Sequence, residues 1–399
     1  MKSHAINDYI SCVYANVRTD ELFEGMWPVP RGITLNSYVV RGEKTALIDP
    51  LSGWGGGAGR AMEAAGCPKA DYLVLNHIEP DHSGRLGEFR ALNPAAKIVS
   101  TEKGLALVKS FHKIDGGLVA VKDGDELDLG GGRSLAFFEA PNLHWPETMV
   151  AWEGASGTLF SCDAFGSYGA TGDRIFDDQF DEGEHALFEE ESLRYYANIV
   201  SPFSAFVERA IGKLSALGVK CVAPGHGIVW RRDPGRIISR YAKYASWAGG
   251  GAEKEIAVIW GSMYGNTKAG LDAVARGIER GGARFTAHRV PDDGLSHALA
   301  AAYRSSGIVI AMPTYEYGMF PPMAHALDMF RRKHIFGKKA LRVGSRGWVG
   351  GAKKEYEAAV EPLKWDSLDS VEWAGFPGAG DLALLEERGA ELARRVMES

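Results

Sequence analysis

The sequence predicts two consecutive α/β domains: a layered domain with much antiparallel sheet, then a doubly wound domain with a five-stranded parallel sheet. Three observations lead to this prediction. The chain has 399 residues, which is enough for two or three domains of ordinary size. A glycine run followed by charged residues at 248–254 is typical of a linker. The apolar pattern also changes there, from short strand-like segments to alternating strands and helices.

The first part, 1–247, contains short β-like segments, many of them separated by glycine turns. We expect strands at 34–40, 45–48, 72–75 and 97–100. Apolar residues recur at helical spacing at 59–65 and near 189–217, which predicts helices. This mixture is typical of a layered α/β domain.

The second part, 255–399, alternates strands and helices in a regular order. We expect strands at 255–260, 284–290, 307–312, 340–344 and 370–374. We expect helices near 267–280, 322–332, 352–363 and 381–397. Five β/α units in roughly 145 residues is the size and rhythm of a doubly wound sheet.

Composition excludes several classes of protein. The net charge is −6 and the pI about 6.0, so the chain offers no general basic surface for nucleic acid or an anionic membrane. It shows no signal-peptide pattern and no membrane-length apolar run. The cysteines form no CxxC pair, which argues against structural zinc, a rubredoxin-type iron site or a thioredoxin-like motif. They are Cys12, Cys67, Cys162 and Cys221. We therefore expect a cytoplasmic protein with free thiols.

Four residues of the types that bind metals fall within six positions, directly after an apolar strand-like segment. They are His77, Glu79, Asp81 and His82. A loop at the end of a strand can turn several side chains toward one point, and Pro80 stiffens this loop. Imidazole and carboxylate ligands together suit borderline divalent metals. The cluster therefore predicts a metal site.

Three further candidates lie downstream, each just past an apolar segment: His144, Asp163 and His226. Taken singly, each histidine is more often a core residue with satisfied hydrogen bonds, and Asp163 more often caps a turn. Their common setting at the ends of strands is where a layered α/β fold gathers functional groups. We therefore include them as candidate ligands.

A second constellation follows the strand expected at 255–260. It consists of Ser262, Met263, Tyr264, Gly265, Asn266 and Thr267, before a helix. Backbone N–H groups and hydroxyls at a helix N-terminus can surround a phosphate. The spacing fits neither the three-glycine dinucleotide motif nor a Walker A loop. It favours a mononucleotide, with FMN as the natural candidate. A plain strand–turn–helix capped by Asn266 is the alternative.

Two later loops follow the third and fourth strands of this part. They are Pro313, Thr314, Tyr315, Glu316, Tyr317 and Gly318, and then Ser345, Arg346, Gly347, Trp348, Gly350 and Gly351. In a doubly wound sheet these loops gather beside the first one. We expect Tyr315 and Trp348 to pack near a flavin ring. The alternative is that both are surface aromatics.

Together these motifs resemble those of the flavodiiron proteins, or A-type flavoproteins, over almost the whole chain. The shared motifs are His77-x-Glu79-x-Asp81-His82, Leu143-His144-Trp-Pro-Glu-Thr-Met149, Phe160-Ser-Cys-Asp163 and Pro224-Gly-His226-Gly, followed by the flavin loops. The resemblance implies a metallo-β-lactamase-like αββα sandwich at 1–247 and a flavodoxin-like FMN-binding domain at 255–399. Hydrolytic relatives of this fold usually have histidine where this chain has Glu79, and they bind zinc. Glu79 therefore marks a di-iron site.

The resemblance also implies a role for each ligand. His77, Glu79 and His144 bind one iron, and Asp163 bridges the two ions. Asp81, His82 and His226 bind the other. The equivalent of His82 does not bind in every family member, so a role in orienting a ligand stays open. Added carboxylates stabilise oxidised metal, in agreement with iron.

The function implied by the resemblance is an electron-transfer oxidoreductase. An external donor, such as a rubredoxin-like protein or a reduced deazaflavin, reduces FMN. FMN passes electrons to the iron pair, where O2 is reduced to water or NO to N2O. Family members form head-to-tail homodimers that bring FMN of one subunit to the iron pair of the other, and a dimer of dimers is a further expectation.

Two other functions are compatible with parts of the sequence. The first is a zinc-dependent hydrolase of the metallo-β-lactamase superfamily fused to a flavodoxin-like domain, against which Glu79 argues. The second is an electron carrier with a vestigial metal site, against which the complete ligand set argues. Metal content separates the first of these from an iron oxidoreductase.

Overall fold

The structure is a computed structural model that describes residues 1–51 and 53–398. The chain forms two compact units. They are Met1–Tyr196 with Ala205–Ala242, and Ala197–Ser204 with Lys243–Ser399. The predicted end of the second domain, Ser399, lies outside the described residues. The predicted division at 248–254 stays a prediction.

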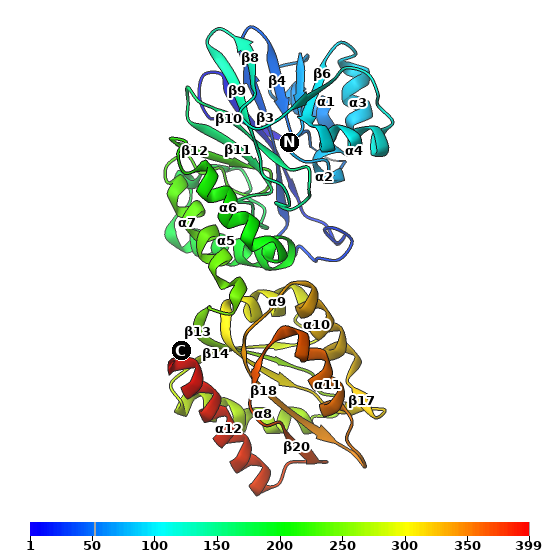
Figure 1. The fold of residues 1–399 in the computed structure, drawn as a ribbon, viewed down its shortest axis with the longest axis vertical. Helices are drawn as coiled ribbons and strands as arrows, with labels where there is room; N and C mark the ends of the chain where they lie inside the picture. Colours follow the sequence, from blue (N-terminus) through cyan, green and yellow to red (C-terminus); the bar gives the residue numbers. More distant parts are fainter. Residues whose placement is uncertain (52, 399) are drawn as a thin grey trace. The chain divides into compact units, whose positions relative to one another are not determined.

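The first unit contains two stacked sheets (Figure 1). The seven-stranded sheet runs in the order β1 (Lys2–Ala5), β2 (Ile10–Val17), β3 (Ile33–Arg41), β4 (Thr45–Ile48), β5 (Tyr72–Val74), β6 (Lys97–Thr101), β7 (Leu118–Val121). The five-stranded sheet runs in the order β12 (Cys221–Pro224), β11 (Thr158–Cys162), β10 (Met149–Glu153), β9 (Arg133–Glu139), β8 (Glu126–Gly130). The seven-stranded sheet is antiparallel from β1 to β4 and parallel from β4 to β7. The predicted layered α/β fold is confirmed.

The first unit also contains seven α-helices within the described residues. They are α1 (Gly57–Ala64), α2 (Pro80–Ser83), α3 (Leu86–Leu92), α4 (Glu102–His112), α5 (Glu182–Tyr195), α6 (Ser204–Leu214) and α7 (Pro234–Ser246). An apolar cluster joins α1, α3 and α4 to one face of the seven-stranded sheet. The helix expected near 189–217 is in fact two helices, because a π turn and a 3-10 turn at Ser201–Phe203 separate α5 from α6. Pro202 lies in that turn and cannot supply the N–H that a continuous helix needs.

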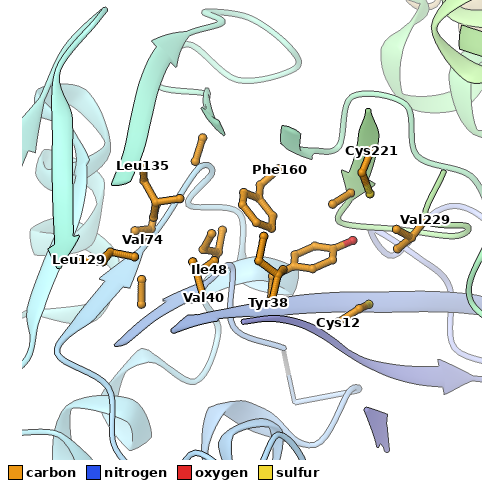
Figure 2. Close-up of a cluster of buried hydrophobic side chains, with 14 of the residues drawn as sticks. Cys12, Tyr38, Val40, Ile48, Val74, Leu129, Leu135, Phe160, Cys221 and Val229 are labelled. Carbon is orange, nitrogen blue, oxygen red and sulfur yellow. The ribbon is translucent and has the colours of Figure 1, made fainter. Parts of the chain in front are cut away.

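The core between the two sheets positions the strand that leads to Asp163. Figure 2 shows Phe160 of β11 facing Tyr38 of β3. Their ring centroids are 5.2 Å apart. Phe160 is fully buried in a cluster drawn from both sheets. We expect Phe160→Ala to lower the free energy of unfolding by about 3–5 kcal/mol, because it leaves a cavity in a closed core. Denaturant unfolding measures this, and Leu92→Ala, at a half-exposed position, should have little effect.

The second unit has a parallel sheet in the order β14 (Arg284–Arg289), β13 (Glu253–Trp260), β15 (Ser305–Ala311), β18 (Lys339–Arg346), with β19 (Asp366–Ser367) and β20 (Val371–Ala374) both beside β18. β19 pairs with the start of β18 and β20 with its end, so the fifth strand position is occupied by an interrupted strand. Its helices are α8 (Asn266–Arg280), α9 (Leu295–Arg304), α10 (Pro321–Arg332), α11 (Ala352–Val360) and α12 (Ala379–Glu398). α8 and α12 cover one face, and α9, α10 and α11 the other (Figure 1). This is the predicted doubly wound fold.

The structure adds elements that the sequence pattern did not predict. A two-stranded ribbon, β16 (Thr314–Tyr315) and β17 (Gly318–Met319), occupies the segment expected to be a plain loop. The helix α9 fills the connection from β14 to β15. Within the described residues, no helix combines the length and the apolar character that crossing a membrane requires.

Candidate functional site

The clustered metal-ligand candidates lie just past the end of β5. Leu75 and Ile78 are buried and anchor the segment against the core. The sequence predicted a loop here, but the second half is the short helix α2, with Pro80 in its first turn. His77 is fully buried, as expected for a residue directly after a central strand.

The first group of ligand atoms gathers around Glu79. Its Oε2 lies 3.2 Å from His77 Nε2 and 3.0 Å from His144 Nε2. Both imidazole nitrogens also lie 3.4 Å from Asp163 Oδ2. These four residues offer ligand atoms that all lie within 4.8 Å of one another.

The second group gathers around Asp81. Its Oδ2 lies 3.5 Å from His82 Nε2 and 3.2 Å from His226 Nε2. The same two nitrogens lie 2.9 Å and 3.1 Å from Asp163 Oδ1. His82 therefore points its Nε2 into the group with the same geometry as His226.

Asp163 belongs to both groups, with Oδ1 facing one and Oδ2 facing the other. It follows β11, and Cys162 before it adopts a left-handed backbone conformation (φ 51°) that ends the strand. The Tyr195 hydroxyl of α5 donates to Asp163 Oδ1 at 3.1 Å. A carboxylate placed between two ligand groups can bridge two metal ions.

The buried carboxylates and imidazoles of the site stabilise each other's charged forms. Burial alone would raise the pKa of Asp163, but the facing imidazoles of His82, His144 and His226 hold it well below its usual range. Burial lowers the pKa of His77, yet its hydrogen bonds to Glu147 and Glu79 outweigh this and raise the pKa to about 10.

His226 and Glu79 show the same balance: burial disfavours the charged form of each side chain, and its charged neighbours favour it. For His226, the carboxylates of Asp163 and Asp81, which lie 3.1 Å and 3.2 Å from its Nε2, outweigh burial and raise the pKa to about 10. For Glu79, hydrogen bonds from His144 and His77 outweigh burial and lower the pKa to about 2. Because metal ions compete with protons for these nitrogens, metal uptake releases protons and strengthens as the pH rises.

Glu147 is a functional residue that the sequence reasoning did not select. Its Oε1 accepts a 2.7 Å hydrogen bond from His77 Nδ1 and a 3.2 Å bond from Ile78 N. This contact fixes the tautomer of His77 so that Nε2 faces the ligand group. The sequence signal that could have identified Glu147 is its place three residues after His144, within the motif Leu143–Met149.

A pocket of about 430 Å³ opens over the ligand groups. It is lined by Leu22, Phe23, Glu24, Gly25, Gly53, Trp54, Glu79, Pro80 and Asp81. The Phe23 ring lies 5.7 Å from that of His226. The segment 22–25 was not predicted to belong to the site, because apolar residues in a loop carry no distinctive sequence pattern.

The residues present fit a pair of metal ions. Within residues 1–51 and 53–398, the buried oxygens Asp81 Oδ1 and Asp163 Oδ2 have no hydrogen-bond partner, which is costly unless another group satisfies them. The donors are imidazole and carboxylate without thiolate, a set that suits iron among the borderline metals.

Gly225 is needed for the second group to close. A Cβ at Gly225 would lie 2.6 Å from His82 Cε1 and 3.3 Å from the Cys162 carbonyl oxygen. We expect Gly225→Ala to push the His82 ring out of the group and to lower bound metal by about one ion per chain. Metal analysis after loading tests this. Gly212→Ala, at an exposed helix position with open space, should retain the full content, and an unchanged content in Gly225→Ala would contradict the expectation.

The predicted flavin loops meet at one pocket of about 400 Å³ in the second unit. Most of the predicted residues line it: Ser262, Met263, Tyr264, Asn266, Thr267, Pro313, Thr314, Tyr315, Glu316, Ser345, Arg346, Gly347 and Trp348. Gly375 also lines it and was not predicted, because it follows the short strand β20. The other predicted residues lie outside the lining: Gly265, Tyr317, Gly318, Gly350 and Gly351.

These outer residues shape the loops instead. Gly265 has φ 95° and its N–H donates to Ser262 Oγ at 3.1 Å, which forms the turn before α8. The ring of Tyr317 packs edge-on against Trp348, with centroids 6.3 Å apart.

The pocket fits a phosphate-bearing aromatic group. Thr314 Oγ1 is buried in its wall, and no group in the described part of the chain forms a hydrogen bond with it. The N-terminus of α8 supplies free N–H groups. Trp348 is 80% exposed and Tyr315 is 39% exposed, so both rings are available to a planar ligand.

Comparison with known proteins agrees with this geometry. Residues 33–227 match the family model described as "ODP family beta lactamase". The chain is 33% identical over 376 residues to an anaerobic nitric oxide reductase flavorubredoxin of Vibrio vulnificus, covering 92% of this chain and 74% of that one. It is 32% identical over 377 residues to a nitric oxide reductase of Moorella thermoacetica, covering 92% of both.

Solved structures show the same relationship over the whole chain. Rubredoxin oxygen:oxidoreductase from Desulfovibrio gigas superposes with a TM-score of 0.93 at 26% identity, covering 100% of this chain and 99% of that one. The flavodiiron protein from Giardia intestinalis superposes with a TM-score of 0.92 at 26% identity, covering 100% and 97%. With its two ligand groups, its flavin pocket and these relatives, the chain belongs to the flavodiiron protein family.

Proposed function

We propose that the protein is an oxidoreductase that reduces O2 to water, NO to N2O, or both, at a non-haem di-iron site. Electrons reach that site through FMN from an external donor. The observation that carries this proposal is Asp163, whose two oxygens face two separate ligand groups. The names of the relatives, nitric oxide reductase and oxygen:oxidoreductase, support the same activity.

Seven residues would hold the two irons. His77, Glu79 and His144 would hold one, and Asp163 would bridge to the other; Asp81, His82 and His226 complete the second set. The distances place His82 Nε2 beside Asp163 Oδ1, which supports a direct ligand role. When bound, the iron pair supplies two one-electron redox centres and FMN supplies two further electrons. The pocket over Glu79 and Asp81 gives a small oxidant access to this point.

The flavin pocket would hold FMN in the second unit. The turn 262–267 would bind the phosphate at the N-terminus of α8, and Tyr315 and Trp348 would flank the ring. The domain division that we propose is an iron-binding domain at 1–247, a linker at 248–254 and an FMN-binding domain at 255–399.

We further propose a head-to-tail homodimer and the assembly of two such homodimers into a dimer of dimers. A two-fold dimer presents two equal contacts, each joining the flavin pocket of one subunit to the metal pocket of the other. Leu22 and Met26 beside the metal pocket are 43% and 50% exposed, and Trp348 at the flavin pocket is 80% exposed. Exposed apolar side chains at both pockets support such an interface.

The external donor is a rubredoxin-like protein or a reduced deazaflavin, and the location is the cytoplasm. The name of the Desulfovibrio gigas neighbour, rubredoxin oxygen:oxidoreductase, supports the first donor. The zinc hydrolase alternative is not favoured, because Glu79 replaces a histidine and the relatives are named as reductases.

The test is anaerobic reduction of iron-loaded, FMN-loaded protein, followed by parallel measurement of O2 and NO consumption. Iron and FMN are quantified on the same sample. We expect two irons and one FMN per chain and catalytic consumption of at least one of the two gases. Two zinc ions, no iron and no gas consumption would sink the proposal in favour of a hydrolase.

A further inference from the structure

A chain of three charged side chains lies beneath the flavin loop 346–351. Arg342 of β18 is fully buried, and its Nη1 donates to Glu372 Oε2 of β20 at 2.8 Å. The other carboxylate oxygen, Oε1, lies 3.3 Å from Arg346 Nε at the end of β18. Arg342 Nε and Nη2 are buried and have no hydrogen-bond partner among the described residues, so the contact with Glu372 satisfies Nη1 alone.

The alternation of side chains along β18 explains why Arg342 and Arg346 lie on the same face of the sheet. Residues 342, 344 and 346 lie on the same face of the strand, since side chains alternate. Gly344 pairs with Glu372 across the sheet. A Cβ at Gly344 would lie 3.2 Å from Arg342 Nη2, so the glycine leaves room for the guanidinium. The carboxylate of Glu372 therefore sits between the two arginines.

Glu372 also touches the far end of the flavin loop. A Cβ at Gly350 would lie 2.4 Å from Glu372 Oε1 and 3.4 Å from Arg346 Cδ. The loop thus begins at Arg346 and returns at Gly350 against the same carboxylate. Arg346 lines the flavin pocket, as does Trp348 at the tip of the loop.

We propose that Glu372 is a positioning residue for the flavin. Anchored by buried Arg342, it holds both ends of the loop 346–351 in the conformation that binds FMN, and it partly neutralises Arg346 beside the ring. This inference rests on the proposed FMN site. Charge-assisted hydrogen bonds of this kind hold a fixed geometry at low cost in reorganisation.

Removing the charge of the Glu372 carboxylate should affect both FMN binding and the flavin midpoint potential. Loss of the carboxylate charge releases the loop, which weakens FMN binding. It also leaves the positive charge of Arg346 uncompensated near the ring, which favours reduced, anionic flavin and shifts the midpoint potential upward. A purely structural role would lower stability without this upward shift.

The experiment compares the full-length wild type with Glu372→Gln, Arg346→Ala and Glu357→Gln. Glu357 is an exposed residue of α11, so its substitution removes the same charge away from the loop. FMN dissociation is followed by recovery of flavin fluorescence, and the midpoint potential by anaerobic titration. We expect Glu372→Gln to bind FMN about 10-fold more weakly than Glu357→Gln, with a more positive potential.

Arg346→Ala keeps the buried Arg342–Glu372 pair, so it tests the loop without risking the fold. We expect it to weaken FMN binding. A double variant that carries both Arg346→Ala and Glu372→Gln should bind FMN no more weakly than the weaker-binding of the two single variants. Wild-type affinity and potential in Glu372→Gln, or fully additive losses in the double variant, would overturn the inference. A wild type that binds no FMN would overturn the proposed flavin site and this inference with it.

Discussion

The Asp163→Asn variant is expected to keep its FMN but to bind clearly fewer than two irons per chain. Asparagine preserves the shape of the side chain, yet it leaves one oxygen and no charge between two groups that each need a carboxylate oxygen. Loss of a shared ligand affects both ions, so reduction of O2 or NO should fall at least about 100-fold, beyond the effect of losing a supporting residue. Iron analysis and gas consumption on the same sample measure both effects.

The matched control for this variant is Asp173→Asn. Asp173 has an 88% exposed side chain and pairs with Lys2 on the surface. It should retain two irons and the wild-type rate. If Asp163→Asn also kept two irons and full activity, the assignment of a bridging carboxylate would be wrong.

The Gly351→Ala variant is expected to lose FMN while keeping its iron. A Cβ at Gly351 would lie 1.8 Å from the Tyr317 carbonyl oxygen, so the loops 313–318 and 345–351 must move apart. Both loops line or support the flavin pocket. Overpacking of this size costs about 1–3 kcal/mol, which corresponds to about 5- to 150-fold weaker FMN binding. Flavin fluorescence and absorbance titrations give the affinity.

Gly380→Ala serves as its control, because that position lies in the first turn of α12 with open space around the Cβ. It should bind FMN as the wild type does. Comparing the two variants shows whether the iron site and the FMN site depend on each other. Asp163→Asn should affect iron and not FMN, and Gly351→Ala should affect FMN and not iron, because the two sites are built from different units. Loss of both cofactors in either variant would indicate a general folding defect.

The class of fold and the residue types at the two sites can be predicted from the sequence alone. Apolar segments with period two or in continuous runs located β3, β4, β5 and β6 closely, because buried strands need such patterns. The concentration of His77, Glu79, Asp81 and His82 in six positions indicated metal binding, since few other roles place four such side chains together. The turn 262–267 indicated a phosphate site for the same local reason.

Which distant residues come together could not be predicted from the local sequence pattern and depends on the three-dimensional packing. His144, Asp163 and His226 are separated in sequence, and nothing in their local pattern distinguishes a ligand from a capped turn. Their convergence depends on the strands β9, β10, β11 and β12 lying side by side in one sheet, and on the stacking of this sheet against the other. The same holds for Glu147, whose contact with His77 spans 70 residues. It holds also for Glu372, which meets Arg342 across two neighbouring strands. Local sequence sets which groups a segment offers, whereas long-range packing sets which groups face each other, because facing requires chain segments far apart in sequence to be folded together.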